Sequence, residues 1–286
     1  MRPEAIAVLS AMGWAGDAIL VRIGARTSNI IAAAFMSYAF AALLLWVYLF
    51  VYVRLDLLWS PATTYFLLSG CLQPLLARIL YYVGITRIGV SRAGPLRGAE
   101  PLVSVSLAIV FLHEHPNSFV YWGTALIMAS VWLILWRRSG EGRWKFLDIF
   151  FPLGAAFCGA VSQNLRKGGL LILPDPYIGA AISTSTSLVI FSVFLLATGK
   201  IRLARPHRES LPFFGSAALL SAGAQILNFS ALNGGEVSAM VPLLNTTPLF
   251  TVLFSAVFLR DVEKVTLRII VGAVVMVAGV VIITSR

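Results

Sequence analysis

The sequence predicts an all-α integral membrane protein with ten transmembrane helices, arranged as two inverted five-helix repeats. Three observations lead to this fold class. The 286 residues are 59% hydrophobic and only 12% charged, whereas soluble domains carry about 25% charged residues. The chain divides into apolar runs, most of them close to the roughly 20 residues that a helix needs to cross a bilayer. Finally, one proline-containing stretch is repeated in the second half of the chain.

The apolar runs are separated mostly by short linkers, which favours helical hairpins with little soluble mass. The first run follows Arg2 and could be read as a signal peptide, but Glu4 and Asp17 are poor fits to its apolar core. This run also has a counterpart in the middle of the chain, so we expect a retained helix. The expected spans are 4–23, 29–53, 61–85, 92–112, 117–136, 149–168, 177–198, 211–232, 237–259 and 266–284.

The fourth and ninth spans contain the repeated stretch. Residues 90–114 read VSRAGPLRGAEPLVSVSLAIVFLHE, and residues 237–261 read VSAMVPLLNTTPLFTVLFSAVFLRD, with ten of 25 positions identical. Proline interrupts a helix, and broken helices in matching places of two halves are typical of transporters because they expose backbone polar groups to a ligand. We therefore predict gating kinks at four prolines, which are Pro95, Pro101, Pro242 and Pro248.

The repeat unit predicts the domain organisation. Residues 1–136 form the first five-helix repeat, the basic segment 137–148 is a linker, and residues 149–286 form the second repeat. Because five is an odd number, the second repeat enters the membrane upside down relative to the first. The result is a pseudo-two-fold axis in the membrane plane, a common plan for alternating-access carriers.

Basic residues are distributed unevenly between the two sides of the predicted bundle. The linkers after helices 1, 3, 5, 7 and 9 hold 15 lysines and arginines, and the opposite side holds five, to which we assign Arg166 and Lys167. The positive-inside rule then places the odd linkers in the cytoplasm and both termini outside a cell membrane. The net charge of +10 is attributed to topology and lipid headgroups, and no nucleic acid partner is expected.

Four ionisable residues stand out inside the expected spans: Asp17, Arg78, Arg97 and Glu100. Their formal charges sum to zero, and Arg97 and Glu100 share a helix face because they are three residues apart. Two interpretations remain open. The four residues form a neutralised network that holds helices together, or they line a cavity that meets a charged substrate or a proton.

The second half has neutral polar residues at equivalent positions. Gln225 aligns with Arg78, Asn228 with Tyr81, and an amide pair lies beside the counterpart of Asp17. A shared cavity would have a charged wall and a hydrogen-bonding wall, which suits a small polar or zwitterionic metabolite, although each amide could instead join two helices. Aromatic rings could stack on the ligand. The candidate substrate-binding residues are Trp14, Asp17, Arg78, Tyr81, Arg97, Glu100, Gln163, Asn164, Gln225, Asn228 and Asn245.

Metal, cofactor and enzyme signatures are weak in the sequence. His113 and His115 flank Glu114, but residues two apart diverge on a helix, so no metal is expected. The sequence contains neither an HExxH nor a GxxxxGK[ST] pattern. We therefore expect no cofactor and no enzymatic activity, with transport driven by a gradient or by exchange.

The prolines belong to a longer pattern that occurs in both halves. Its residues are the opening Gly13-Trp14-Ala15-Gly16, then Pro95, Pro101, Leu112-His113-Glu114 and Gly123, and again Pro242, Pro248, Leu259-Arg260-Asp261 and Gly272. With this pattern the chain resembles EamA-type carriers of the drug/metabolite transporter superfamily over essentially its whole length. The resemblance implies a central cavity lined by helices 1, 3, 4, 6, 8 and 9, and it implies cytoplasmic termini, opposite to the charge count.

These expectations combine into a functional hypothesis. We expect a monomeric secondary transporter that moves a small polar, amino acid-like solute as an exporter or exchanger by alternating access. Arg78 and Arg97 would attract an anionic group, while Glu100 and Asp17 would pair with them or take a proton. The alternative is an intramembrane lipid-metabolising enzyme or a lipid-flipping protein, in which the same charges would hold a headgroup phosphate.

Overall fold

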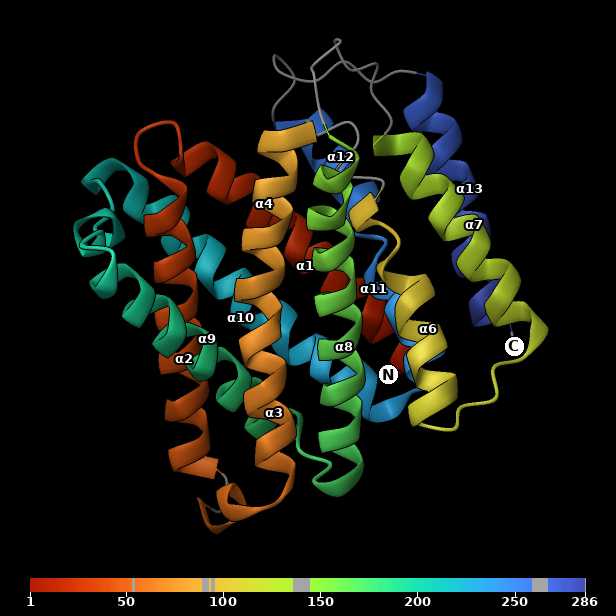
Figure 1. Ribbon diagram of the computed structural model, residues 1–286, viewed down its shortest axis with the longest axis horizontal. Helices are drawn as coiled ribbons and strands as arrows, with labels where there is room; N and C mark the ends of the chain where they lie inside the picture. Colours follow the sequence, from red (N-terminus) through yellow and green to blue (C-terminus); the bar gives the residue numbers. More distant parts are fainter. Residues whose placement is uncertain (53–54, 89–92, 94–95, 136–144, 259–266, 286) are drawn as a thin grey trace.

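The computed structural model describes residues 1–286 apart from 53–54, 89–92, 94–95, 136–144, 259–266 and 286 (Figure 1). Its described secondary structure is entirely helical, with short 3-10 turns and one π-helical segment beside the α-helices. The α-helices are α1 (Pro3–Gly24), α2 (Ile30–Tyr52), α3 (Ala62–Gly70), α4 (Ala77–Ile88), α6 (Glu100–Phe111), α7 (Ser118–Leu135), α8 (Phe150–Ile172), α9 (Pro176–Ala197), α10 (Leu211–Gly234), α11 (Val237–Leu244), α12 (Thr247–Phe258) and α13 (Leu267–Thr284).

Seven described helical segments are long and apolar enough to cross a membrane. Three further apolar helices are shorter. By length and composition, the described residues therefore contain fewer than the ten membrane-spanning helices that the sequence predicts. The shortest, α6, has 12 residues and a length of about 18 Å, less than the roughly 30 Å of a bilayer core. The seven segments are Pro3–Gly24, Ile30–Tyr52, Ala62–Ile88, Phe146–Ile172, Pro176–Ala197, Arg208–Gly234 and Val237–Ser255.

The third expected span, 61–85, is interrupted in the structure. A π-helical segment, Cys71–Leu76, separates α3 from α4, and Gln73 within it has extended backbone angles of φ −137° and ψ 132°. The interruption lies beside Pro74, whose ring removes a backbone N–H donor. The sequence reading treated this span as continuous, so this interruption is a correction.

The repeated stretch is interrupted at equivalent positions in the two halves. A turn at residues 98–99 precedes α6, and a turn at residues 245–246 separates α11 from α12, a shift of 147 residues. Pro101 and Pro248 are each the second residue of the helix that follows, where proline needs no N–H donor. Pro242 lies inside α11, whereas Pro95 falls outside the described residues.

The helices α1 and α8, which correspond in the sequence repeat, run in opposite directions. Pro3, at the start of α1, lies against Gly234 at the end of α10. Lys167, near the end of α8, donates to the carbonyl of Leu232 (2.8 Å), also near the end of α10. Because the start of α1 and the end of α8 meet the same end of α10, these two equivalent helices are antiparallel (Figure 1).

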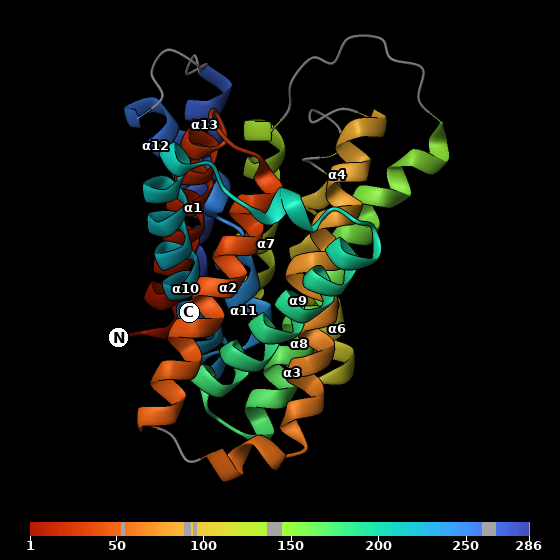
Figure 2. The same ribbon diagram turned by 90° about the vertical axis from the view of Figure 1, so that its left-hand side faces the viewer.

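The packing of the helices follows the repeat. In the described chain α1 packs against α10, and their repeat equivalents α8 and α3–α4 pack against each other. Figures 1 and 2 both show α3 and α8 side by side. The contacts of α2 with α9 and of α7 with α13 join equivalent helices. Two further contacts correspond between the halves: α2 packs against α10 as α9 packs against α3, and α1 packs against α12 as α8 packs against α6. These contacts are therefore unchanged when the two halves are exchanged.

The helices α7 and α13 approach each other through glycines. A Cβ at Gly123 would overlap the side chain of Ile283 and the carbonyl of Gly279. Small residues allow the two backbones to approach this closely. In a membrane, where the hydrophobic effect does not drive helices together, the van der Waals contacts of such an approach stabilise their association. Gly272 in α13, the counterpart of Gly123 in the family pattern, is also buried.

Two charged side chains bind helix ends at one end of the molecule. The carboxylate of Glu114 accepts hydrogen bonds from the N–H groups of Val237 (2.7 Å) and Ser238 (2.9 Å), at the start of α11. The ammonium of Lys167 donates to the carbonyls of Leu232 and Gly235, both at 2.8 Å, at the end of α10. Glu114, which the sequence placed between two histidines, therefore joins the two repeats as a helix cap.

Candidate functional site

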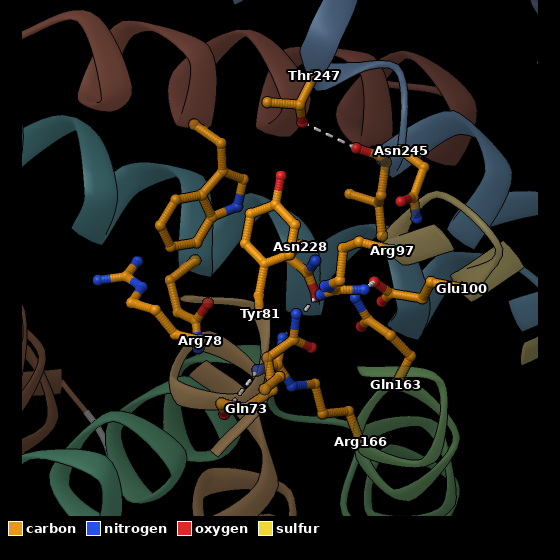
Figure 3. A pocket seen from close by; sticks show the side chains of 14 residues that line it. Gln73, Arg78, Tyr81, Arg97, Glu100, Gln163, Arg166, Asn228, Asn245 and Thr247 are labelled. Atoms are coloured by element: carbon orange, nitrogen blue, oxygen red, sulfur yellow. Dashed lines mark hydrogen bonds and ion pairs between the residues drawn. The ribbon is translucent and has the colours of Figure 1, made fainter. Parts of the chain in front are cut away.

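A polar cavity of about 380 Å³ lies where the interrupted helices meet (Figure 3). Each of the three interruptions contributes side chains to it: Gln73 from the break before α4, Arg97 from just before the turn at residues 98–99, and Asn245 from the turn after α11. Helices α1, α4, α8 and α10 complete the wall. The lining residues are Trp14, Gln73, Ala77, Arg78, Tyr81, Arg97, Glu100, Gln163, Arg166, Gln225, Asn228, Leu244, Asn245 and Thr247.

Nine of the eleven candidate substrate-binding residues lie together in this cavity. They come from both repeats, as expected for a shared cavity. Figure 3 shows Arg97 and Glu100 facing each other at one side, Arg78 at the other, and Tyr81 between them. The nine are Trp14, Arg78, Tyr81, Arg97, Glu100, Gln163, Gln225, Asn228 and Asn245.

Arg97 and Glu100 form an ion pair across the turn that precedes α6. Nη1 of Arg97 donates to Oε2 of Glu100, and the Glu100 side chain is almost fully buried. The carboxylate also lies against α8 at Gly159, where a Cβ would come within 2.7 Å of Cδ and 2.8 Å of both oxygens. A glycine at this position therefore makes room for the carboxylate between the two repeats.

Arg166 is a cavity residue that the sequence reading misplaced. The charge count assigns it to the lipid-headgroup side, but the structure buries it in α8 with 2% of its surface exposed. Its Nη1 donates to Oδ1 of Asn228 (3.2 Å), its Nη2 lies 3.4 Å from the carbonyl O of Gln73, and its Cζ lies 5.0 Å from the ring of Phe229. The sequence could have indicated this position, because Arg166 follows Gln163 by three residues and residues at this spacing share a helix face.

Gln73 and Thr247 also line the cavity although they were not among the candidate residues. Thr247 is the repeat counterpart of Glu100 and places a hydroxyl where the first half has a carboxylate. Gln73 is brought to the cavity by the extended backbone beside Pro74. A Gln-Pro pair inside an apolar run was the signal for that break.

Asp17 lies in a second cavity of about 300 Å³ that shares Arg78 with the first. Asp17 attracts the Arg78 guanidinium electrostatically, and Cζ of Arg78 lies 5.7 Å from the ring of Tyr38. Arg22 also lines this second cavity. Asp17 is thus connected to the first cavity through Arg78 and does not line it.

Asn164 forms a contact between helices rather than part of the cavity wall. Its Nδ2 donates to the carbonyl O of Ser104 (3.1 Å) and Oγ of Ser104 (3.2 Å) in α6, and to the carbonyl of Ala160 (2.9 Å). This is the helix-joining role that the sequence left open for each amide. Gln163, the preceding residue, does line the cavity.

Several polar atoms of the cavity wall are buried without a hydrogen-bond partner among the described residues. They are Oε1 of Gln73, Oε1 of Gln163 and Nε of Arg166. Buried polar groups in proteins are normally hydrogen-bonded, so such atoms next to a cavity can bind a polar solute. The site offers charge, hydrogen-bond donors and acceptors, and two aromatic rings, Trp14 and Tyr81.

Comparisons with known proteins agree with this architecture. The model of the EamA-like transporter family matches residues 1–136 and residues 147–285. A search of curated protein sequences found no match. A solved crystal structure, described only as that of a protein, is similar in fold with a TM-score of 0.79 and 13% sequence identity, covering 100% of this chain and 98% of the other.

Proposed function

Because the chain belongs to the EamA-like transporter family, we propose that it is a secondary transporter that exports or exchanges a small polar metabolite by alternating access. Members of this family, which is part of the drug/metabolite transporter superfamily, are transporters and not enzymes. The chain is accordingly a multi-pass membrane protein. The solute class, the direction and the mechanism are the parts that we propose.

The observation that carries the proposal is the polar cavity at the three helix interruptions. Its volume of about 380 Å³ lies within the range of roughly 300 to 1,000 Å³ typical of small-molecule sites. In transporters, interrupted helices present backbone dipoles to the solute near the bilayer midplane. Charged side chains, amides and aromatic rings around the cavity suit an amino acid-like solute with polar and apolar parts.

Alternating access requires two units that can move relative to each other. We propose two inverted repeats, residues 1–136 and 149–286, joined by the linker 137–148, with the three shorter apolar helices completing a set of ten. The antiparallel α1 and α8 and the exchange symmetry of the helix contacts support this arrangement. Pro101, Pro242 and Pro248 lie next to the interruptions at the cavity, which supports their role as gating kinks.

The cavity is formed within one chain, which supports a monomer as the working unit, and we place it in the cell membrane. In this proposal Arg78 and Arg97 attract the anionic part of the solute, Glu100 and Asp17 balance them or carry a proton, and the amides of Gln163, Gln225, Asn228 and Asn245 set hydrogen-bond specificity. These side chains come from both repeats, so movement of one repeat relative to the other would remake the site.

The first experiment is untargeted mass spectrometry of medium and cell extract from cells that express the wild type or Glu100→Gln. We expect at least one polar metabolite to change its distribution with the wild type alone. Immunoblots of the membrane fraction must show equal amounts of the two proteins. If no solute moves and the lipid profile changes instead, the lipid-flipping alternative replaces this proposal.

A further inference from the structure

We propose that the transported solute has a net negative charge and that Arg166 binds its oxyanionic group, a carboxylate or a phosphate ester. This inference rests on the proposed transport function and deepens it. It assigns the main anion contact to the residue that the sequence placed outside the cavity.

The connected cavities have an excess of positive charge. The first cavity is lined by three arginines, Arg78, Arg97 and Arg166, and by the carboxylate of Glu100, and Asp17 shares the second cavity with Arg78. Charges interact more strongly in a low-dielectric interior than in water, and unpaired charges inside a membrane protein are costly. An anionic solute would offset this excess, whereas a cationic solute would add to it.

The arginines differ in how their charge is compensated. Arg97 forms an ion pair with Glu100, and Arg78 is attracted by Asp17. The hydrogen-bond acceptors of Arg166 are neutral groups, the amide of Asn228 and the backbone carbonyl of Gln73. Within the described ranges no carboxylate forms an ion pair with Arg166, and Glu100 acts on it only through longer-range attraction.

Arg166 also has hydrogen-bonding capacity left for a ligand. Its Nε is buried and has no hydrogen-bond partner among the described residues, and its Nη2 makes only a long contact of 3.4 Å with the carbonyl O of Gln73. The Nε–H and one Nη–H of a guanidinium point in parallel and can bind an oxyanion with two hydrogen bonds. The side-chain amide of Gln163, one turn earlier in α8, can add a third donor from the same wall.

A purely structural role for Arg166 is the competing explanation, because its guanidinium lies over the ring of Phe229. The two explanations differ in one measurable respect. A structural arginine changes the stability of the empty protein, whereas an anion-binding arginine changes the response to anions.

The test uses the purified full chain in detergent and an isosteric probe series. Propionate, propionamide and propylammonium differ mainly in charge, and inorganic phosphate represents the second kind of oxyanion. At constant ionic strength we expect propionate or phosphate to raise the thermal unfolding midpoint of the wild type, and propionamide and propylammonium to raise it less. If neither anion exceeds the neutral amide, the proposal is wrong.

The variants are Arg166→Gln, which removes the charge, and Arg166→Lys, which keeps the charge but loses the planar pair of donors. We expect Arg166→Gln to weaken anion binding by a factor of about ten or more, and Arg166→Lys to retain part of it. Arg87→Gln is the matched control, because Arg87 pairs with Asp148 away from the cavity and its side chain is 56% exposed. An unchanged anion response in Arg166→Gln would assign Arg166 a structural role only.

The metabolite profile separates this inference from the proposed function. If the solute moved by the wild type is neutral or cationic, transport stands and the inference is wrong. If anions stabilise the wild type but not Arg166→Gln, and no metabolite moves in cells, the anion site stands and the proposed transport is wrong.

Discussion

Glu100 shows at the residue scale how a buried carboxylate depends on its neighbours. Its ion pair with Arg97 lies within one turn of the first repeat, but the space for its carboxylate is provided by Gly159 in the second repeat. Burial of an ionised carboxylate is tolerated when it is paired. The position of this charge therefore depends on contact between the two halves.

We predict that Gly159→Ala impairs transport and lowers stability. The added Cβ would lie 2.7 Å from Cδ of Glu100, so the carboxylate must shift and its ion pair with Arg97 would be disturbed. Overpacking of this kind costs about 1 to 3 kcal/mol. The thermal midpoint in detergent and the flux of the metabolite found in cells are the two measurements. Gly154→Ala in the same helix is the control, because its Cβ would have 3.5 Å to the nearest atom, on Leu80, and equal effects of the two variants would contradict the argument.

Removal of the Glu100 charge tests its role in coupling. Glu100→Gln leaves the Arg97 guanidinium without its ion-pair partner, so we expect a transport rate at least about tenfold lower, since breaking a buried pair is strongly destabilising. If Glu100 also carries the coupled proton, the pH dependence of transport disappears in the variant. Flux measured in proteoliposomes across a pH series decides this, and an unchanged rate and pH profile would refute both roles.

At the element scale, the interruptions of helices decide where polar groups meet. Turns at 98–99 and 245–246 and the extended residue Gln73 each bring side chains to one cavity. The start of each short helix also needs hydrogen-bond acceptors, because the first N–H groups of a helix have no partner within it. Glu114 supplies two of these bonds to α11 from the other repeat.

We predict that Glu114→Ala destabilises the protein by about 1 to 3 kcal/mol, the cost of leaving buried N–H groups without acceptors. Glu114→Gln keeps one oxygen acceptor and should lose less. Thermal unfolding in detergent measures both effects. Glu209→Gln, at an exposed position, should stay within about 0.5 kcal/mol of the wild type. A Glu114→Ala protein as stable as this control would show that the cap contributes little.

At the scale of the whole molecule, the orientation of the protein in the membrane can be tested directly. The charge count places the odd linkers in the cytoplasm, whereas the family resemblance implies the opposite. In a background without Cys71 and Cys158, we introduce single cysteines at two exposed positions, Arg202→Cys in an odd linker and Ser285→Cys at the other end of the molecule. From the charge count we expect an impermeant thiol reagent to label only Ser285→Cys in intact cells. Labelling of Arg202→Cys alone would establish the reverse orientation.

Much of the architecture follows from local features of the sequence. The length of the apolar runs identifies a membrane protein, and the spacing of Pro101 and Pro248 predicts the two equivalent interruptions. Both features can be read directly from the sequence. The break at Gln73 was missed because it has no counterpart in the second half, where α10 is continuous. Repetition had supplied the evidence for the other two breaks.

The sequence by itself determined the kind of protein, its repeat and nine of the residues at the cavity, because apolar length, proline spacing and buried polarity are local properties. Only the tertiary structure decided which polar side chains face the cavity. Gln163 and Asn164 are consecutive and about 100° apart on a helix, so one lines the cavity and the other bonds α6. Arg166 lies on the same face of α8 as Gln163 and also lines the cavity. Its position was predicted wrongly because a membrane helix is apolar on most faces, so its sequence alone does not show which face meets the cavity.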